Sequence, residues 1–154
     1  MDAVNRYTTQ HPEDLTYIIG GTAAMLHIRA SHGKQVDTIG LDIHVNSSSD
    51  SDTIAARWLQ LLPHYQLIEP VSGPCQIIRL RSDNKQPINI FVNYRYSLPV
   101  EKVLGYPVEP RDVTASICRY RYKINTELLK IDYTNSRDKI LEQQKRLKQR
   151  IVYL

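Results

Sequence analysis

The stretch YIIGGTAAMLH (residues 17–27) joins an apolar run, two glycines and a run of helix-forming residues. This order predicts a strand from Leu15 to Ile19, a tight turn, and a helix from Thr22 to about Ala30. Two adjacent glycines allow a ligand to approach the backbone closely, because no side chain stands in the way. The helix that follows presents unpaired N–H groups and the positive end of its dipole, which suits a phosphate. An ordinary strand-to-helix turn is the alternative interpretation.

A second polar strand is expected further along the chain, where residues 40–45 read GLDIHV. Successive side chains of a strand point to opposite faces, so Asp42 and His44 share one face. Asp42 is either a metal ligand or an acidic residue on a solvent-facing strand. His44 is either a ligand or a half-exposed strand residue.

A strand, Gly-Gly-Thr, a helix and then an acidic strand resemble the nucleotidyltransferase superfamily, especially its minimal and abortive-infection toxin members. In that family the glycine turn holds the nucleoside triphosphate. Two Asp residues and a third carboxylate on a later strand bind two divalent metal ions. Gly20, Gly21 and Thr22 match the first motif, and Asp42 matches the first Asp. His44 stands where the second Asp is expected. The linker between the two motifs is longer than the family leads us to expect.

Two later strands extend the resemblance. Residues 88–92 read INIFV within a predicted strand from Pro87 to Tyr94, where the family typically has Ile-Asp-Ile-Phe-Val. Asn89 occupies the register of the third carboxylate, so the acid has become an amide. A loop over residues 82–86 leads back to a predicted strand from Gln76 to Ser82. On this strand Arg79 and Arg81 share a face, which either meets phosphates or is simply exposed.

Nucleotidyl transfer depends on charge neutralisation, and Mg²⁺ prefers hard oxygen ligands. Asp42 offers one carboxylate and is the candidate catalytic residue. His44 offers a neutral nitrogen that suits Mn²⁺ or Zn²⁺ better than Mg²⁺, and Asn89 offers a carbonyl oxygen without charge. The resemblance implies a metal site for Mg²⁺ or Mn²⁺ at Asp42, His44 and Asn89. It also implies a site for ATP or another NTP at Gly20, Gly21 and Thr22, and Arg79 and Arg81, from their shared strand face, are the further candidates for binding its phosphates.

The remaining predicted elements are mostly helices, over residues 2–10, 53–62, 111–129 and 136–152. Trp58 is predicted to lie in the core. The last helix has a thin apolar stripe, formed by Ile140, Leu141, Leu147 and Ile151. We therefore expect an α/β (α+β) fold with a mixed, mainly antiparallel sheet flanked by helices. Residues 1–154 are expected to form one nucleotidyltransferase-like domain, with its core at about 13–110 and a helical part at about 111–154.

Charge is distributed unevenly along the chain. Residues 111–154 hold 11 Lys/Arg and 5 Asp/Glu, whereas residues 1–110 hold 9 and 11. The basic C-terminal third contacts a nucleic acid or another polyanion, or it forms a solvated helix surface. Cys75 and Cys118 have no metal-ligand spacing, which favours reduced thiols in a cytoplasm, with a lone disulfide as the alternative. The N-terminus lacks a signal-peptide layout, and no apolar run reaches the ~18 residues that span a membrane. We therefore expect a cytoplasmic protein without membrane contact.

Three functions are compatible with these patterns. The first is a nucleotidyltransferase-like protein with degenerate catalytic carboxylates. It retains NTP binding or acts on a protein or nucleic-acid partner through the basic C-terminal helices. The second is an active metal-dependent enzyme that moves a nucleotide from an NTP onto a protein, RNA or small molecule, using Asp42 with Mn²⁺. The third is a basic interaction domain without a nucleotide site.

Overall fold

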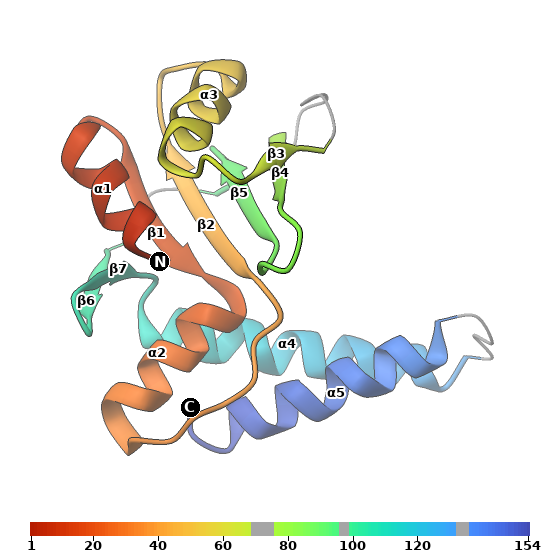
Figure 1. Cartoon of the computed structure of the whole chain (residues 1–154). Helices are drawn as coiled ribbons and strands as arrows, with labels where there is room; N and C mark the ends of the chain where they lie inside the picture. Colours follow the sequence, from red (N-terminus) through yellow and green to blue (C-terminus); the bar gives the residue numbers. More distant parts are fainter. Residues whose placement is uncertain (69–75, 96–98, 132–135) are drawn as a thin grey trace.

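The strand and helix predicted around the two glycines lie near the centre of a mixed sheet (Figure 1). The computed structural model describes residues 1–68, 76–95, 99–131 and 136–154. Within these ranges the seven-stranded sheet has the order β3-β4-β5-β2-β1-β7-β6. The strands are β1 (Leu15–Ile19), β2 (Leu41–Asn46), β3 (Gln66–Leu67), β4 (Gln76–Arg81), β5 (Ile88–Val92), β6 (Glu101–Val103) and β7 (Tyr106–Val108). The helices are α1 (Asp2–Gln10), α2 (Gly20–His32), α3 (Ser51–Leu61), α4 (Arg111–Leu129) and α5 (Arg137–Ile151).

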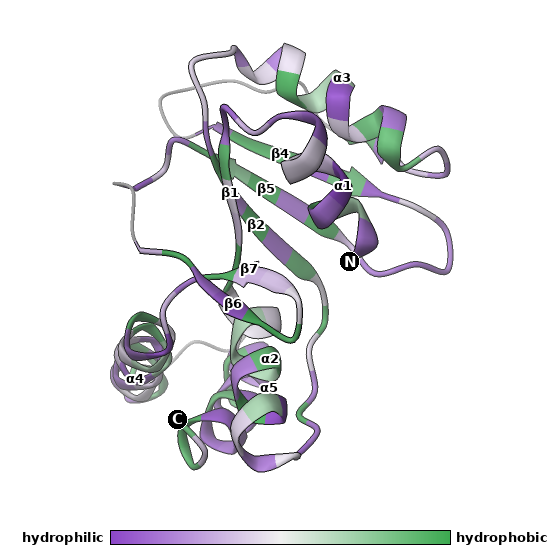
Figure 2. Cartoon of the chain, turned by 90° about the vertical axis from the view of Figure 1, so that its left-hand side faces the viewer, coloured by the Kyte–Doolittle hydropathy of each residue, from purple (hydrophilic) through white to green (hydrophobic). Residues whose placement is uncertain are grey.

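Strand pairing confirms the predicted mixed, mainly antiparallel sheet. The pairs β1–β7 and β2–β5 are parallel, and the other four are antiparallel. Figure 2 shows hydrophobic and hydrophilic segments alternating along β2 and β5. This alternation is expected of strands that bury one face and use the other for polar groups.

The hydrophobic core lies between one face of the sheet and the helices α1 and α3. Ile43 of β2 and Ile90 of β5 are fully buried in it. Trp58 is fully buried as predicted, and its ring stacks on Tyr7 with the centroids 4.6 Å apart. Because α1 and α3 cover this face, Asp42 and Asn89 lie on the opposite one.

The helices α2, α4 and α5 gather at the end of the sheet where β1 runs into α2 (Figure 1). Ile19 at the end of β1 pairs with Asp42, and Asp42 pairs with Asn89 across the parallel β2–β5 ladder. The antiparallel pair α4–α5 packs against α2 at this same end. The topology therefore brings the polar strand residues to the C-terminal helices.

Most element boundaries agree with the sequence, with a few corrections. α2 begins at Gly20, so both glycines belong to its first turn rather than to a turn before it. The predicted stripe of α5 is wrong at Leu141, which is 45% exposed, whereas Arg150 is 94% buried. Cys118 is buried in α4, and Cys75 lies outside the described residues. None of the described helices is long and apolar enough to cross a membrane.

Candidate functional site

The buried carboxylate of Glu109 binds the junction between β1 and α2. Its Oε1 accepts a hydrogen bond from the Gly20 backbone N–H at 3.2 Å and another from the Thr114 hydroxyl at 3.0 Å. Its Oε2 forms an ion pair with Arg95 at 2.9 Å. The Glu109 backbone N–H also donates to the Ile18 carbonyl at 2.9 Å. Glu109 thus occupies the first N–H of α2 and ties it to the start of α4.

Close neighbours leave no room for a Cβ atom at either glycine. Gly20 has a φ of +68°, and a Cβ there would lie 2.9 Å from Asp42 Oδ2. A Cβ on Gly21 would lie 2.9 Å from Nη2 of Arg150. The first two residues of α2 therefore allow a carboxylate and a guanidinium group to approach the helix backbone closely.

Three side chains form a hydrogen-bonded chain across the neighbouring strands. Arg81 Nη1 donates to Asn89 Oδ1 at 3.2 Å, and Asn89 Nδ2 donates to Asp42 Oδ1 at 3.1 Å. A flipped amide would place its oxygen against the carboxylate and its NH₂ against the guanidinium group. Electrostatics therefore fix the orientation of Asn89.

These strand residues line a cavity of about 290 Å³ at the end of the sheet, which we call the cleft. Its sheet wall comprises Gly21, Asp42, Arg81 and Asn89. Its helix wall, from α4 and α5, comprises Arg121, Gln143, Arg146 and Arg150. Thr38, Ile39, Gly40 and Pro87 complete the lining. Four guanidinium groups and one carboxylate face this small volume, so the cleft favours an anionic ligand.

Arg150 is the most enclosed cation of the cleft. It is 94% buried, and its Nε has no hydrogen-bond partner among the described residues. Its Nη2 donates to the carbonyl oxygen of Asp37 at 3.0 Å. Burial lowers the pKa of Arg150, because the charged form loses hydration.

His44 does not line the cleft, and the half-exposed interpretation of this residue is wrong because its side chain is fully buried. Its Nε2 accepts hydrogen bonds from the backbone N–H groups of Tyr94 at 3.1 Å and Arg95 at 3.2 Å. Burial, with a smaller effect from the charge of Arg95, lowers the pKa of His44 to about 4. A neutral imidazole therefore supports the chain that follows β5.

Three predicted nucleotide-binding residues also lie outside the lining of the cleft. Gly20 is held by Glu109, and the hydroxyl of Thr22 donates to the Gly40 carbonyl at 2.8 Å. Arg79 pairs with Asn89 in the β4–β5 register but is absent from the lining. The structure thus brings together Gly21, Asp42, Arg81 and Asn89 from the predicted set.

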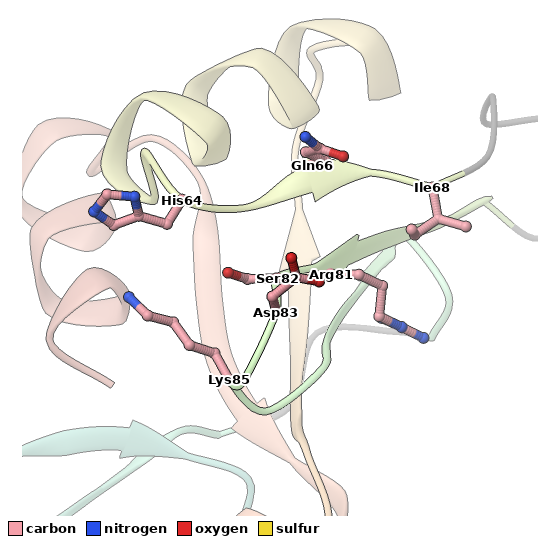
Figure 3. A pocket seen from close by; sticks show the side chains of 7 residues that line it. All are labelled: His64, Gln66, Ile68, Arg81, Ser82, Asp83 and Lys85. Atoms are coloured by element: carbon pink, nitrogen blue, oxygen red, sulfur yellow. The ribbon is translucent and has the colours of Figure 1, made fainter.

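A second hollow of about 470 Å³ lies at the β3–β4 edge of the sheet (Figure 3). Its lining includes Asp83, one of two acids that lie close in sequence to residues of the cleft. Figure 3 shows the guanidinium end of Arg81 extending away from His64 and Lys85. The other acid, Asp37, contributes its backbone carbonyl to Arg150 and is not in the cleft lining. Neither carboxylate is part of the cleft.

The donors in the cleft do not fit the two-metal site that the fold family implies. Asp42 supplies the only carboxylate that the described residues bring to the lining, and Asn89 turns its NH₂ rather than its carbonyl oxygen toward that carboxylate. His44 uses Nε2 to accept two backbone N–H groups. Among the described residues, no three His, Cys, Asp or Glu side chains gather as a metal site requires. Mg²⁺ prefers several oxygen ligands, which these side chains do not supply together.

No protein-family model matches the sequence, and no curated protein matches it. The fold of this chain, in contrast, is similar to that of several solved structures. The Megavirus polyadenylate synthase matches with a TM-score of 0.56 and 15% identity, over 98% of this chain and 32% of that enzyme. The chain has a nucleotidyltransferase fold. At such low identity this is a likeness of fold alone.

Two further structures with the nucleotidyltransferase fold match less closely. An antigenic nucleotidyltransferase-like protein from Paracoccidioides brasiliensis has a TM-score of 0.44 and 12% identity, over 94% of this chain and 72% of that one. A cytoplasmic RNA terminal U-transferase has a TM-score of 0.40 and 17% identity, over 60% of this chain and 26% of that one. The chain thus spans less than a third of the polyadenylate synthase and of the U-transferase.

Sequence reasoning missed the helix wall and Glu109. In the sequence, the arginines of α4 and α5 cannot be told from solvent-exposed arginines, because a solvated helix face has the same composition as one that faces a cleft. The basic excess of residues 111–154 was the available signal, and three of its arginines face the cleft. Glu109 gave no comparable signal, since its role depends on residues about ninety positions away.

Proposed function

We propose that the protein is a nucleotidyltransferase-like protein that binds a nucleoside triphosphate in the cleft and has lost the two-metal transfer reaction. One observation carries the proposal. Four arginines and a single carboxylate, Asp42, line a cavity beside the first turn of α2. Arginine matches phosphate oxygens in charge and geometry, so the cleft suits a polyphosphate.

A neighbouring hollow supports a nucleotide rather than a bare phosphate. It has a volume of about 510 Å³ and shares Ile39, Gln143 and Arg146 with the cleft. Ile39 is 67% exposed there, and Ile140 of α5 also lines the hollow. An apolar surface beside a phosphate site gives the nucleoside part somewhere to pack.

Loss of transfer is proposed because the ligands for catalytic metal ions are not assembled. An active enzyme needs carboxylates that hold metal ions against both the attacking and the leaving oxygen. The cleft offers Asp42 alone, hydrogen-bonded to Asn89. The residues of the cleft bind the phosphates and neutralise their charge, but they do not carry out the transfer.

Calorimetric titration with ATP and with GTP, each in Mg²⁺ and in EDTA, tests the binding. Arg121→Gln removes a guanidinium group from the cleft, whereas Arg119→Gln removes one from the exposed side of the same helix. Binding should weaken about tenfold in the first variant and stay unchanged in the second. No binding by the unaltered protein, or equal losses in both variants, would contradict the proposed site.

A transfer assay with radiolabelled NTP in Mg²⁺ and in Mn²⁺ tests the loss of activity. We expect no label on the protein itself or on added RNA. Metal-dependent labelling that disappears in Asp42→Ala would show instead an active nucleotidyltransferase, with Asp42 as its catalytic carboxylate.

A further inference from the structure

We propose that the cleft binds the phosphates of its nucleotide without a divalent cation, with guanidinium groups supplying the positive charge that metal ions supply in a two-metal site. The inference rests on the proposed function and adds what that function leaves open, the form of the ligand. The ligand is the free nucleoside triphosphate or another polyphosphate, rather than its magnesium complex.

The balance of charge in the cleft favours a metal-free anion. Its lining holds Arg81, Arg121, Arg146 and Arg150 against Asp42, so the net charge is 4 − 1 = +3. A cation that approached Asp42 would meet these guanidinium groups at short range. Free ATP carries more negative charge than its magnesium complex and gains more from the same groups.

Arg150 has binding capacity that the chain leaves unused. Its Nη2 is bound to the Asp37 carbonyl, but its Nε is buried without a partner. No carboxylate of the described residues lies within ion-pair distance of it. A buried charge without a counter-ion is costly, because desolvation is not offset by an opposite charge. A phosphate oxygen in the cleft would supply both the charge and the missing acceptor.

The other cations of the helix wall are also weakly engaged. Arg146 has only a 3.9 Å ion pair with Glu142, which is exposed. Arg121 forms no hydrogen bond or ion pair with the described residues. Two arginines from α4 and α5 are therefore available beside Arg150. Arginine can bind phosphate through two parallel N–H groups, so each of them offers more than a point charge.

On the sheet wall, a neutral donor takes the position of a cation. Asn89 Nδ2 donates to Asp42 Oδ1, and the carbonyl oxygen of Asn89 is occupied by Arg81. Asp42 Oδ1 and Asn89 Oδ1 thereby each already accept a hydrogen bond. The Arg81–Asn89–Asp42 chain compensates the carboxylate without metal.

Titration with ATP and with inorganic tripolyphosphate, each in EDTA and in Mg²⁺, tests the inference. We expect ATP affinity in EDTA to equal or exceed that in Mg²⁺, and tripolyphosphate to bind in EDTA. Binding of ATP only with Mg²⁺ or Mn²⁺ would overturn the inference and leave the proposed function standing. No binding of any nucleotide in either buffer would overturn the proposed function, and the inference with it.

The role of the guanidinium groups is tested on α5, in EDTA. Arg150→Gln should weaken tripolyphosphate binding about tenfold or more, and Lys148→Gln, an exposed position on the same helix, should not. Circular dichroism and thermal unfolding report whether Arg150→Gln is folded. If it is not, Arg146→Gln replaces it, because that side chain is not part of the core. Wild-type affinity in a folded variant that lacks a cleft arginine would overturn the proposal.

Discussion

The two walls of the cleft hold their polar groups in opposite ways. On the sheet wall, Arg81, Asn89 and Asp42 are hydrogen-bonded to one another. On the helix wall, the described residues provide no partner for the buried Nε of Arg150 and only a long ion pair for Arg146. A satisfied network rigidifies its surroundings, whereas buried, unmet donors stabilise whatever ligand satisfies them. Under the proposed function, the sheet wall is a scaffold and the helix wall supplies the binding energy.

Removal of Glu109 should have the largest effect, because this residue joins the start of α2 to the start of α4, next to the cleft. Its carboxylate binds the backbone of Gly20 and the hydroxyl of Thr114, and it pairs with Arg95. Glu109→Ala leaves these groups without a partner in a buried position, so the free energy of unfolding should fall by about 3 kcal/mol. Urea unfolding measures the change.

Glu101→Ala is the matched control, because Glu101 is exposed and makes one long hydrogen bond to the Arg111 backbone. It should change the free energy of unfolding by less than about 0.5 kcal/mol. A similar small loss in Glu109→Ala would show that α2 and α4 are held together by other contacts.

The second prediction concerns His44, which follows Asp42 on the same face of β2 but serves the fold. Its pKa is about 4 in the folded protein against an ordinary value of 6.5. The unfolded chain therefore binds a proton that the native protein excludes, and stability is lost as the pH falls from 6.5 toward 4. The loss should reach about 3 kcal/mol by the lower end of this window.

Urea unfolding at several pH values measures this loss, with His44→Gln as the comparison. Glutamine retains an acceptor for the two backbone N–H groups but does not titrate. The variant should lose less stability than the unaltered protein between pH 6.5 and 4. Parallel pH profiles would assign the acid sensitivity to other groups and remove the structural role of His44.

The third prediction restores an acid on the sheet wall. Asn89→Asp places a carboxylate within 3.1 Å of Asp42 Oδ1, where the amide now donates. Repulsion between the two acids should lower the free energy of unfolding by about 1–2 kcal/mol in EDTA. Two adjacent carboxylates also favour a divalent cation, so Mn²⁺ should raise the melting temperature of this variant and leave the unaltered protein unchanged.

Asn93→Asp controls for the loss of an amide donor, since Asn93 binds the Ser47 carbonyl outside the cleft. It should show no response to Mn²⁺. An equal Mn²⁺ response in the unaltered protein would mean that Asn89 is already compatible with a metal, and the contrast between the walls would lose its basis.

The two walls also differ in how far the sequence predicts them. Strand periodicity placed Asp42 and Asn89 each on one face of its own strand, and the resemblance implied that they share a site. The parallel register confirms that they are neighbours. Periodicity is a local property of a strand, so it is readable without the fold. For the basic C-terminal third, which includes Arg150, a polyanion contact and a solvated surface both stayed open, because an arginine that faces a cleft and one that faces water have the same pattern on a helix. Only the packing of α5 on α2 distinguishes them.

The roles of Glu109 and His44 could not be predicted from the sequence, for a related reason. The partners of the Glu109 carboxylate come from α2, α4 and the chain after β5, and no local pattern connects these segments. His44 was misjudged because alternation predicts which face a side chain lies on, but not what covers that face. Its acceptor role depends on the backbone of Tyr94 and Arg95.

The smallest predicted effect is also the one that best distinguishes the roles of the two walls. Asp42→Asn keeps the shape of the side chain and an acceptor for Asn89, but it removes the single negative charge of the cleft lining. If guanidinium groups bind the phosphates, removal of this charge reduces repulsion. ATP in EDTA should then bind about fivefold more tightly. Calorimetric titration measures the difference.

A metal-dependent site predicts the opposite sign, because Asp42→Asn would remove its one anionic ligand. Asp52→Asn on α3 is the control, since Asp52 is exposed and lies outside the cleft lining. It removes the same charge from the chain and should leave ATP affinity unchanged. Weaker binding in Asp42→Asn alone would show that the sheet wall attracts the ligand through a cation. The division into scaffold and binding surface would then be reversed.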